Sequence, residues 1–473
     1  MLCILLVFIY SCNVTDKHKD KIIKSAGLKN DFKILRQTLE EAHPGLYWYT
    51  EKPLMDKHFD SIYALLDTDM TRVTFFKTLL PLIAKIKCLH TNVQLLNEPG
   101  NSRVKFTKIL PYHFFCTNGK IYITNDYSNL GHTGAEVLSI NNVSSKKITQ
   151  TLLNSLPSDG YNETYKYQLL NSGAFGEGYA LFFGQPESFA VEVIDSGCIK
   201  PVIYTVKAKS VQDIPGLNNK PSRQSVYVDF TNDSSTAVLT VNTFEMNTNK
   251  FNEIISAIFK TIKDKNIQQL IIDLRKNGGG NNDNVPQLLS FLATDTFLHL
   301  KRAERNAGNF TYLQYFDNKE AIKNLGGVYE HHEKYLMNYR YAGTSYTQPV
   351  SALGYTGKVV VLTSGHTTSA ASEFAAIAHY TNRAIIVGEE TGGCYYGATG
   401  GTYIQLILPA SKINVRIPTI RIFTAVTEDS LHPKGRGTFP DYTVTPQIND
   451  ILKGRDVQLE AAFQVLSKKA TGQ

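Results

Sequence analysis

The 473-residue chain has little that would mark a nucleic-acid-binding, zinc-binding or multi-pass membrane protein. Its 49 basic and 42 acidic residues leave a net charge of +7, but no arginine-rich block or basic helix is present, which disfavours nucleic-acid binding. None of its six cysteines forms a Cys-x-x-Cys pair, and no His/Asp/Glu spacing indicates a metal site. No internal repeat or low-complexity tract is present. After the N-terminus, no segment is apolar for long enough to span a membrane.

The N-terminus, MLCILLVFIYSC, holds the one apolar run of note. Because it is too short to cross a bilayer as a helix, it is more typical of a secretory signal. Its Ile9-Tyr10-Ser11-Cys12 ending resembles a bacterial lipobox, in which Cys12 would be lipidated after cleavage. The alternative is a plain signal peptide or a truncated start. We therefore expect residues 1–12 to be a signal peptide or lipobox. The protein would then be secreted, or held by a lipid anchor at a membrane surface of the cell envelope (periplasm or outer membrane).

The length and the changing texture of the chain indicate two or three domains. Residues 25–100 have the apolar spacing of helices, whereas residues 101–210 contain short β-rich runs separated by Gly, Asn and Ser. Residues 226–470 contain long apolar strands such as TAVLTV, QLIIDL and KVVVLT, with helical segments between them. Continuous apolar strands alternating with helices predict a sheet that is covered on both faces.

Two local patterns give more specific expectations. The segment FFKTLLPLIAKIKCLH predicts a helix that starts at Phe75 and ends near His90. The segment GAEVLSINNVSSKKITQTLLNSL predicts a strand, a turn and then a helix.

Two segments about 90 residues apart carry the chemistry of interest. LIIDLRKNGGGNN, Leu270 to Asn282, is an apolar strand that enters a glycine turn with bare backbone N–H groups. VVVLTSGHTTSAASEFAAIA, Val359 to Ala378, places Ser369 after a second strand, at the expected start of a helix. A hydroxyl beside a group of N–H donors is what acyl transfer needs, namely a nucleophile and a site for the oxyanion. The alternatives are that Ser369 is only a helix N-cap and that the glycines form a plain turn.

Together with other motifs, these segments resemble the C-terminal processing protease and tricorn family of serine peptidases, also called tail-specific proteases. The resemblance rests on DLRKNGGG, on SGHTTSAASEFAAIAHYTNRAIIVGEETGG and on the Pro-Asp segment that starts with GTFPDYTV at Gly437. The opening DFKILRQTLEEAHPGLYWYT resembles the helical module of lipoprotein-type members from the Bacteroidetes group. GAEVLSINN resembles the core of a PDZ-like domain. The resemblance implies an α/β (α+β) multidomain fold: a helical N-terminal module, a PDZ-like β-rich module and an α/β protease core of the ClpP/crotonase-like type.

The resemblance also implies roles for individual residues. Ser369 corresponds to the family's nucleophile, and Ser372, one turn along the helix, would only cap or pack. The N–H of Ala370 would form the oxyanion hole with Gly279 or its neighbour Gly278. The expected substrate is a polypeptide, and neither a cofactor nor a metal is implied.

The general base is the open question. In the Ser-Lys branch a lysine follows the nucleophile by about 25 residues, but Cys394 stands there in this chain. The tricorn-like branch takes a histidine from the helical module, and His90 occupies that place. Imidazole is a suitable base near neutral pH, although a lone histidine at a helix end is often only a cap. That branch orients its histidine with a preceding serine and a glutamate near the Pro-Asp segment. Here Leu89 precedes His90, and no glutamate is in register.

Other polar residues near the motifs have two readings each. His366, three residues before Ser369, is a second candidate base or a plain loop residue. Glu390, after a strand end, would bind substrate or fix its loop. Asp273 is expected to form a structural ion pair with Arg275 or a turn hydrogen bond. The lysine is missing, and His90 lacks the serine and the glutamate that would orient it. The alternative function is therefore that of a catalytically weak relative, which binds peptides or another ligand in the same cleft.

Overall fold

The computed structural model describes residues 21–95, 108–215, 225–233, 235–306, 310–323, 330–332, 335–338 and 347–468. The expected signal peptide and Cys12 lie outside these residues. Within them, no helix combines the length and the hydropathy that crossing a membrane requires.

A helical unit (residues 21–95) opens the described chain. In α1, apolar residues at helical spacing, Leu28, Phe32, Leu35 and Leu39, are all buried. The predicted helix from Phe75 exists, but it ends at Lys85, five residues before His90, so the expectation of a helix-terminal histidine is wrong. The elements of this unit are β1 (Ile22–Ile23), α1 (Ser25–Ala42), α2 (Lys52–Leu65), β2 (Met70–Thr71), α3 (Arg72–Lys85) and β3 (Asn92–Leu95).

A middle unit (residues 108–213) is built on a sheet with strand order β10-β9-β7-β6-β5. The predicted strand, turn and helix are confirmed as β7, a turn at Asn141–Asn142, the short β8 and α4. The elements are β4 (Lys108–Ile109), β5 (Tyr112–Thr117), β6 (Lys120–Asp126), β7 (Glu136–Ile140), β8 (Val143–Ser144), α4 (Ser145–Ser155), α5 (Thr164–Leu169), the π-helix η1 (Leu170–Ala174), α6 (Phe175–Phe183), β9 (Ser188–Ile194), β10 (Val202–Lys207), β11 (Lys209–Ser210) and the 3-10 turn η2 (Val211–Asp213).

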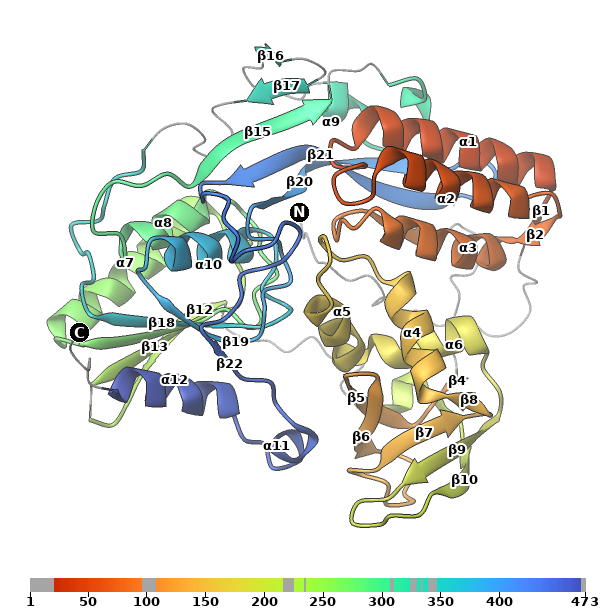
Figure 1. Ribbon diagram of the computed structural model, residues 1–473, viewed down its shortest axis with the longest axis horizontal. Helices are drawn as coiled ribbons and strands as arrows, with labels where there is room; N and C mark the ends of the chain where they lie inside the picture. Colours follow the sequence, from red (N-terminus) through yellow and green to blue (C-terminus); the bar gives the residue numbers. More distant parts are fainter. Residues whose placement is uncertain are drawn as a thin grey trace.

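A C-terminal unit (residues 226–467) contains the sheet with order β12-β13-β14-β18-β19-β22, parallel except at the β12 edge. Leu270 and Ile272 pack with α7 and α10, whereas Ile271 packs with α12 on the other face. The predicted two-sided sheet is therefore confirmed (Figure 1). Its elements are β12 (Val226–Phe230), β13 (Thr236–Val241), α7 (Thr248–Asp264), β14 (Gln269–Asp273), α8 (Asn284–Ser290), β18 (Lys358–Thr363), α10 (Ala370–Tyr380), β19 (Ile385–Gly388), β22 (Tyr442–Thr443), α11 (Ile448–Leu452) and α12 (Val457–Ser467).

Another sheet joins the helical unit to the C-terminal unit. Its strand order is β16-β17-β15-β21-β20, and β3 of the helical unit pairs antiparallel with β21. Apolar residues of α1 and of the β20–β21 hairpin share one core, and the hairpin lies along α1 and α2 in Figure 1. The elements are β15 (Leu300–Asn306), η3 (Leu313–Tyr315), α9 (Lys319–Lys323), β16 (Glu330–His332), β17 (Tyr335–Asn338), β20 (Gly397–Ile407) and β21 (Ile413–Thr424).

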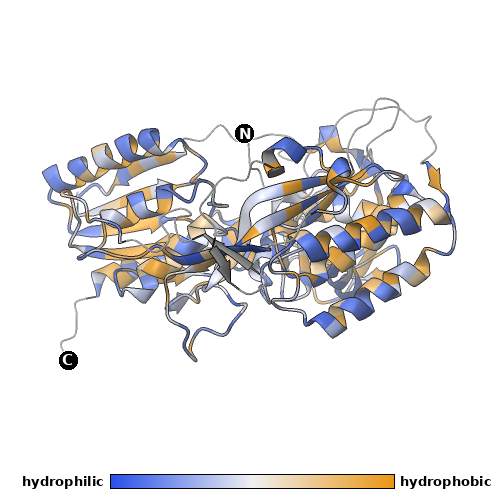
Figure 2. Ribbon diagram, turned by 90° about the horizontal axis from the view of Figure 1, so that it is seen from above, coloured by the Kyte–Doolittle hydropathy of each residue, from blue (hydrophilic) through white to orange (hydrophobic). Residues whose placement is uncertain are grey.

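The hydropathy of the ribbon follows this layering. Strands inside the molecule are largely hydrophobic, whereas the outer helices turn a hydrophilic side outward (Figure 2). The carboxyl ends of β14 and β18, the start of β20 and the turn after α3 converge, which places glycine, serine and histidine segments from distant parts of the chain together.

Candidate functional site

Ser369 is held in a strained turn between β18 and α10. Its φ of 54° and ψ of −130° are uncommon for a residue with a side chain. Although Ser369 occupies the N-cap position, its side chain makes no capping hydrogen bond. The turn before it is fixed to the other segment, because Thr367 Oγ1 donates to the Leu274 carbonyl at 2.9 Å and Thr368 Oγ1 donates to the Gly278 carbonyl at 3.1 Å. The Ser369 hydroxyl is thus presented by the backbone without being used to close the helix.

The glycine turn touches Ser369 directly. Gly279 has a φ of +95°, and a Cβ at this position would lie 2.7 Å from Ser369 Cβ and 3.0 Å from the Ala370 nitrogen. Real Cβ atoms do not approach that closely, so only glycine fits here. The two segments that the sequence places about 90 residues apart are therefore in contact.

Two sets of N–H groups border the serine. Ala370 is the first residue of α10, and its N–H has no acceptor among the residues that the structure describes. The positive end of the helix dipole adds to the pull on an anion at this point. The Gly279 N–H donates to Asn277 Oδ1 at 2.9 Å, so in this conformation it is engaged. Gly280, rather than Gly278 or Gly279, lines the cavity next to Ser369.

A cavity of about 380 Å³ contains both Ser369 and His90 in its wall. Its lining comes from the turn after α3, the glycine turn, the first turn of α10 and the β20–β21 hairpin. Gly400 of β20 is in van der Waals range of His90: a Cβ there would lie 3.8 Å from Cε1 and 3.9 Å from Nε2. The full lining is His90, Glu245, Gly280, Asn281, Asn282, Asp283, Ser369, Glu373, Ala398, Gly400, Gly401, Tyr403 and Ile422.

His90 is a buried, neutral imidazole. It is 2% exposed, and burial, aided by the positive charge of Arg416, lowers its pKa to about 3. Its Nδ1 is buried and has no hydrogen-bond partner in the described part of the chain. The residue after it is fixed to the helical unit, because His43 Nε2 and Thr91 Oγ1 are hydrogen-bonded at 2.9 Å.

A second buried group lies beside His90. Asp159, in the turn between α4 and α5 of the middle unit, is 2% exposed, and burial raises its pKa to about 7. Its Oδ1 accepts the Leu89 N–H at 2.9 Å, while no described residue bonds its buried Oδ2. Sequence reasoning missed Asp159, since Pro-Ser-Asp-Gly is typical of an exposed turn.

Cys88 completes this cluster, and its geometry invites comparison with a metal site. One ligand atom from each of Cys88, His90 and Asp159 lies within 4.8 Å of the others. The Cys88 thiol, however, donates to the Thr399 carbonyl at 3.7 Å, and burial raises its pKa to about 12. The Cys88 thiol thus already has a hydrogen-bond partner within the protein.

Other residues singled out from the sequence lie away from the cavity. His366 is bonded to Ser172 Oγ of the middle unit at 2.8 Å, burial lowers its pKa to about 4, and it is not part of the cavity wall. Glu390 accepts from Arg436 at 2.9 Å and from the Gly437 N–H at 2.8 Å, so it fixes the loop that leads to Pro440. Neither side chain is placed against Ser369.

Three further expectations concern structural roles. Asp273 pairs with Arg275 at 2.7 Å, as predicted, and Arg275 also pairs with Asp456. Ser372 donates to the Ser369 carbonyl at 2.7 Å, which agrees with a packing role. Cys394 is buried, and the pKa of its thiol lies well above the usual value because of burial, followed by the charge of Asp159.

Glu373 is a cavity residue that the sequence analysis did not identify. It lies in the first turn of α10, is 3% exposed, and accepts from Asn282 at 2.9 Å and from His299 at 3.0 Å. A carboxylate inside the apolar segment SEFAAIA was the available signal.

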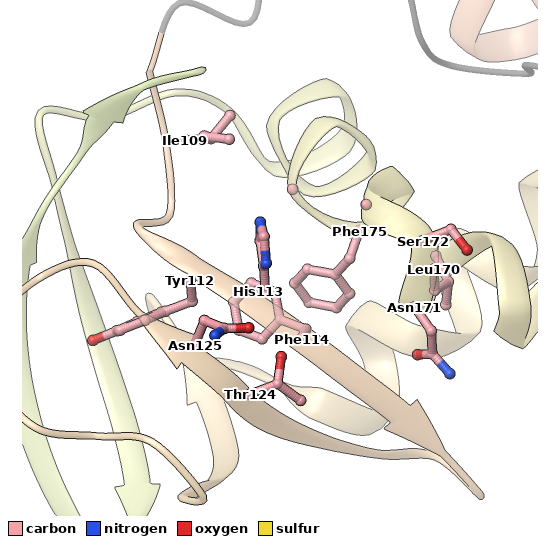
Figure 3. Close-up of a pocket in the computed structure, with 12 residues that line it drawn as sticks. Ile109, Tyr112, His113, Phe114, Thr124, Asn125, Leu170, Asn171, Ser172 and Phe175 are labelled. Carbon is pink, nitrogen blue, oxygen red and sulfur yellow. The ribbon is translucent and has the colours of Figure 1, made fainter. Parts of the chain in front are cut away.

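The middle unit holds a separate cavity of about 320 Å³, drawn in Figure 3. Its lining includes His113 from β5, Asn125 from β6 and Phe175 from α6. None of its lining residues lines the cavity that contains Ser369.

Comparison with known proteins places this geometry in context. The family model described as peptidase family S41 matches residues 235–444. The chain is similar to mature CPAF complexed with lactacystin, with a TM-score of 0.61, 14% identity, and coverage of 93% of this chain and 98% of that one. It is similar to mature CPAF, with a TM-score of 0.59, 16% identity, and coverage of 93% and 97%. A CPAF mutant gives a TM-score of 0.64, 14% identity, and coverage of 95% and 99%. At these identities the structural likeness establishes the fold alone.

We predict that Gly279→Ala damages the site locally. The added Cβ would collide with Ser369, and alanine would have to adopt the positive φ of this position. The variant should therefore lose about 1–3 kcal/mol of stability and react at least about tenfold more slowly with a serine-directed fluorophosphonate. The matched control is Gly278→Ala, since a Cβ there would meet only Thr368 Oγ1 at 3.9 Å. Equal behaviour of the two variants in thermal unfolding and labelling would contradict the proposed close approach.

We also predict a pH signature for Asp159. Its pKa of about 7 in the folded protein exceeds the value of about 3.9 in an unfolded chain. The native state therefore binds more protons between these values, and this carboxyl lowers stability as pH rises from about 4 to about 7. Asp159→Asn should remove this loss of stability, so the stability of the variant relative to wild type should rise by about 2–3 kcal/mol between pH 5 and 8. Urea unfolding at several pH values measures this. A pH-independent difference would show that Asp159 ionises normally.

Proposed function

The chain belongs to peptidase family S41 and is a serine-type peptidase, and from this premise we propose that it hydrolyses peptide bonds through Ser369, His90 and a backbone oxyanion hole. The observation that carries the proposal is the contact of the glycine turn with Ser369, in a cavity that His90 also lines. The substrate is a polypeptide, whose backbone would enter this cavity between the glycine turn and β20.

The proposed reaction begins with attack of Ser369 Oγ on the peptide carbonyl. His90 accepts the Ser369 proton and later passes it to the leaving amine. The Ala370 N–H stabilises the oxyanion together with Gly279 of the glycine turn, whose N–H must first leave Asn277 Oδ1. A protonated, buried Cys394 supports assigning the base to His90 instead of to the position of the missing lysine.

A second candidate is a relative that binds peptides in the same cavity without cleaving them efficiently. The observation in its favour is the low pKa of His90, which makes its imidazole a weak base unless a neighbouring charge stabilises the imidazolium. The two candidates differ in turnover and not in peptide binding.

Covalent labelling tests the nucleophile. Fluorophosphonate should modify Ser369, and Ser369→Ala should abolish both labelling and peptide hydrolysis while remaining folded, because its side chain closes no helix. Ser372→Ala is the matched control and should retain activity within about tenfold, since it loses only one hydrogen bond. Wild-type turnover in Ser369→Ala, with loss in Ser372→Ala, would assign the reaction to the other serine.

We further propose that Cys12 anchors the protein to a membrane surface of the cell envelope. The support is the apolar run that ends in Ser11-Cys12.

The anchor predicts a change in fractionation. In a bacterial host, wild type should sediment with membranes and Cys12→Ser should move to the soluble or secreted fraction, because no lipid can attach. Membrane association that survives the substitution would place the anchor elsewhere.

A further inference from the structure

Two side chains that lie close together at the proposed base each have a buried polar atom without a partner. His90 Nδ1 and Asp159 Oδ2 have no hydrogen-bond partner in the described residues, and both side chains are 2% exposed. A ring nitrogen of His90 and a carboxylate oxygen of Asp159 lie within 4.8 Å of one another. Buried polar groups left unpaired cost free energy, so such a pair calls for an explanation.

The backbone fixes Asp159 against the turn that carries His90. Asp159 Oδ1 accepts the Leu89 N–H at 2.9 Å, and the Gly160 N–H donates to the Lys87 carbonyl at 2.9 Å. On its other side, the Tyr161 N–H donates to the Gly435 carbonyl at 2.7 Å. The turn is therefore clamped between the residues before His90 and the loop before Pro440.

We propose that Asp159, a residue of the middle unit, is the positioning carboxylate for His90, an inference that rests on the proposed function of Ser369 and His90. The Asp159 oxygen without a partner accepts a hydrogen bond from the Nδ1–H of His90, either after a small side-chain shift to hydrogen-bond distance or through one bridging water. This bond selects the tautomer in which Nε2 carries the lone pair. The Ser369 proton moves to Nε2, and the Asp159 charge stabilises the imidazolium that forms.

In this arrangement each side chain stabilises the charged form of the other, which neither could adopt favourably alone. Burial disfavours the charged form of each group, so a lone imidazolium at His90 would be unfavourable. Formed together, imidazolium and carboxylate compensate one another in the same dry site. The arrangement also explains how the chain manages with Leu89 before its histidine and no glutamate in register near Pro440.

The other buried carboxylates near the site are already engaged. Glu373 accepts from Asn282 and His299, and Glu390 accepts from Arg436 and the Gly437 N–H. Of Glu373, Glu390 and Asp159, Asp159 alone has a buried oxygen with no hydrogen-bond partner among the described residues.

The experiment compares Asp159→Asn with wild type in three measurements. Asparagine keeps an oxygen for the Leu89 N–H but removes the charge. We expect kcat for a peptide substrate to fall about 100-fold or more, with KM within about threefold. The rate of fluorophosphonate labelling of Ser369 should fall in parallel. In NMR spectra of ¹⁵N-histidine-labelled protein, assigned with His90→Gln, wild-type His90 should carry its proton on Nδ1, and Asp159→Asn should lose this preference.

Asp31→Asn is the matched control for neutralising a buried carboxylate. Asp31 is fully buried in α1 and accepts the Ala410 and Ser411 N–H groups at 2.9 and 2.7 Å, away from the cavity. The Asp31→Asn variant should keep the kcat and the His90 tautomer of the wild-type protein. The role of Asp159 would be overturned if kcat fell less than about threefold in Asp159→Asn. It would also be overturned if Asp31→Asn lost as much kcat as Asp159→Asn. An unchanged tautomer in Asp159→Asn would overturn it as well.

These outcomes separate the inference from the proposed function. Wild-type protein that neither hydrolyses peptides nor labels at Ser369 would overturn the proposed function, whatever Asp159 does. Active wild type with an unaffected Asp159→Asn variant would overturn only the role of Asp159.

Discussion

The close approach of Gly279 to Ser369 is the constraint on which the site depends. A Cβ at Gly279 would lie 2.7 Å from that of the serine, so the two strand ends meet only because one of them carries no side chain. Thr367 and Thr368 then fix the contact by hydrogen bonds to the Leu274 and Gly278 carbonyls. Strain at Ser369 is tolerated because the surrounding strands, β14 and β18, are paired residue by residue and are buried at their centres.

The middle unit contributes to the site through one rigid turn. Gly160 has a φ of +55°, and a Cβ there would lie 2.2 Å from the Gly435 carbonyl oxygen. The turn is thus wedged against the loop that Glu390 and Arg436 hold by their ion pair. Asp159 reaches His90 only because these segments from three regions of the chain are packed together. A carboxylate that is buried for this purpose lowers stability at neutral pH, which is the usual relation between a functional site and the fold that supports it.

Much of the α/β unit could be predicted from the sequence, because LII in β14 and VVVL in β18 are continuous apolar runs typical of a sheet that is covered on both faces. The end of α3 could not. Its apolar pattern continues to Ile86, and the break falls at Lys87, which adopts a φ of 58° without being a glycine. The β20–β21 hairpin was missed because the glycines around Gly397 and Gly400 are typical of a loop. Asp159 was missed because the residues that hydrogen-bond to its turn, Lys87, Leu89 and Gly435, are far from it in the sequence.

The central claim is that Ser369, the glycine turn and His90 form one reaction centre. A crystal structure of the fluorophosphonate adduct tests it most directly. The account predicts phosphorus on Ser369 Oγ, with one phosphonyl oxygen within about 3 Å of the Ala370 nitrogen and of a glycine-turn nitrogen. The His90 ring should lie within about 3–5 Å of Oγ. An adduct on another serine, or a His90 ring more than about 10 Å from Oγ, would contradict the account.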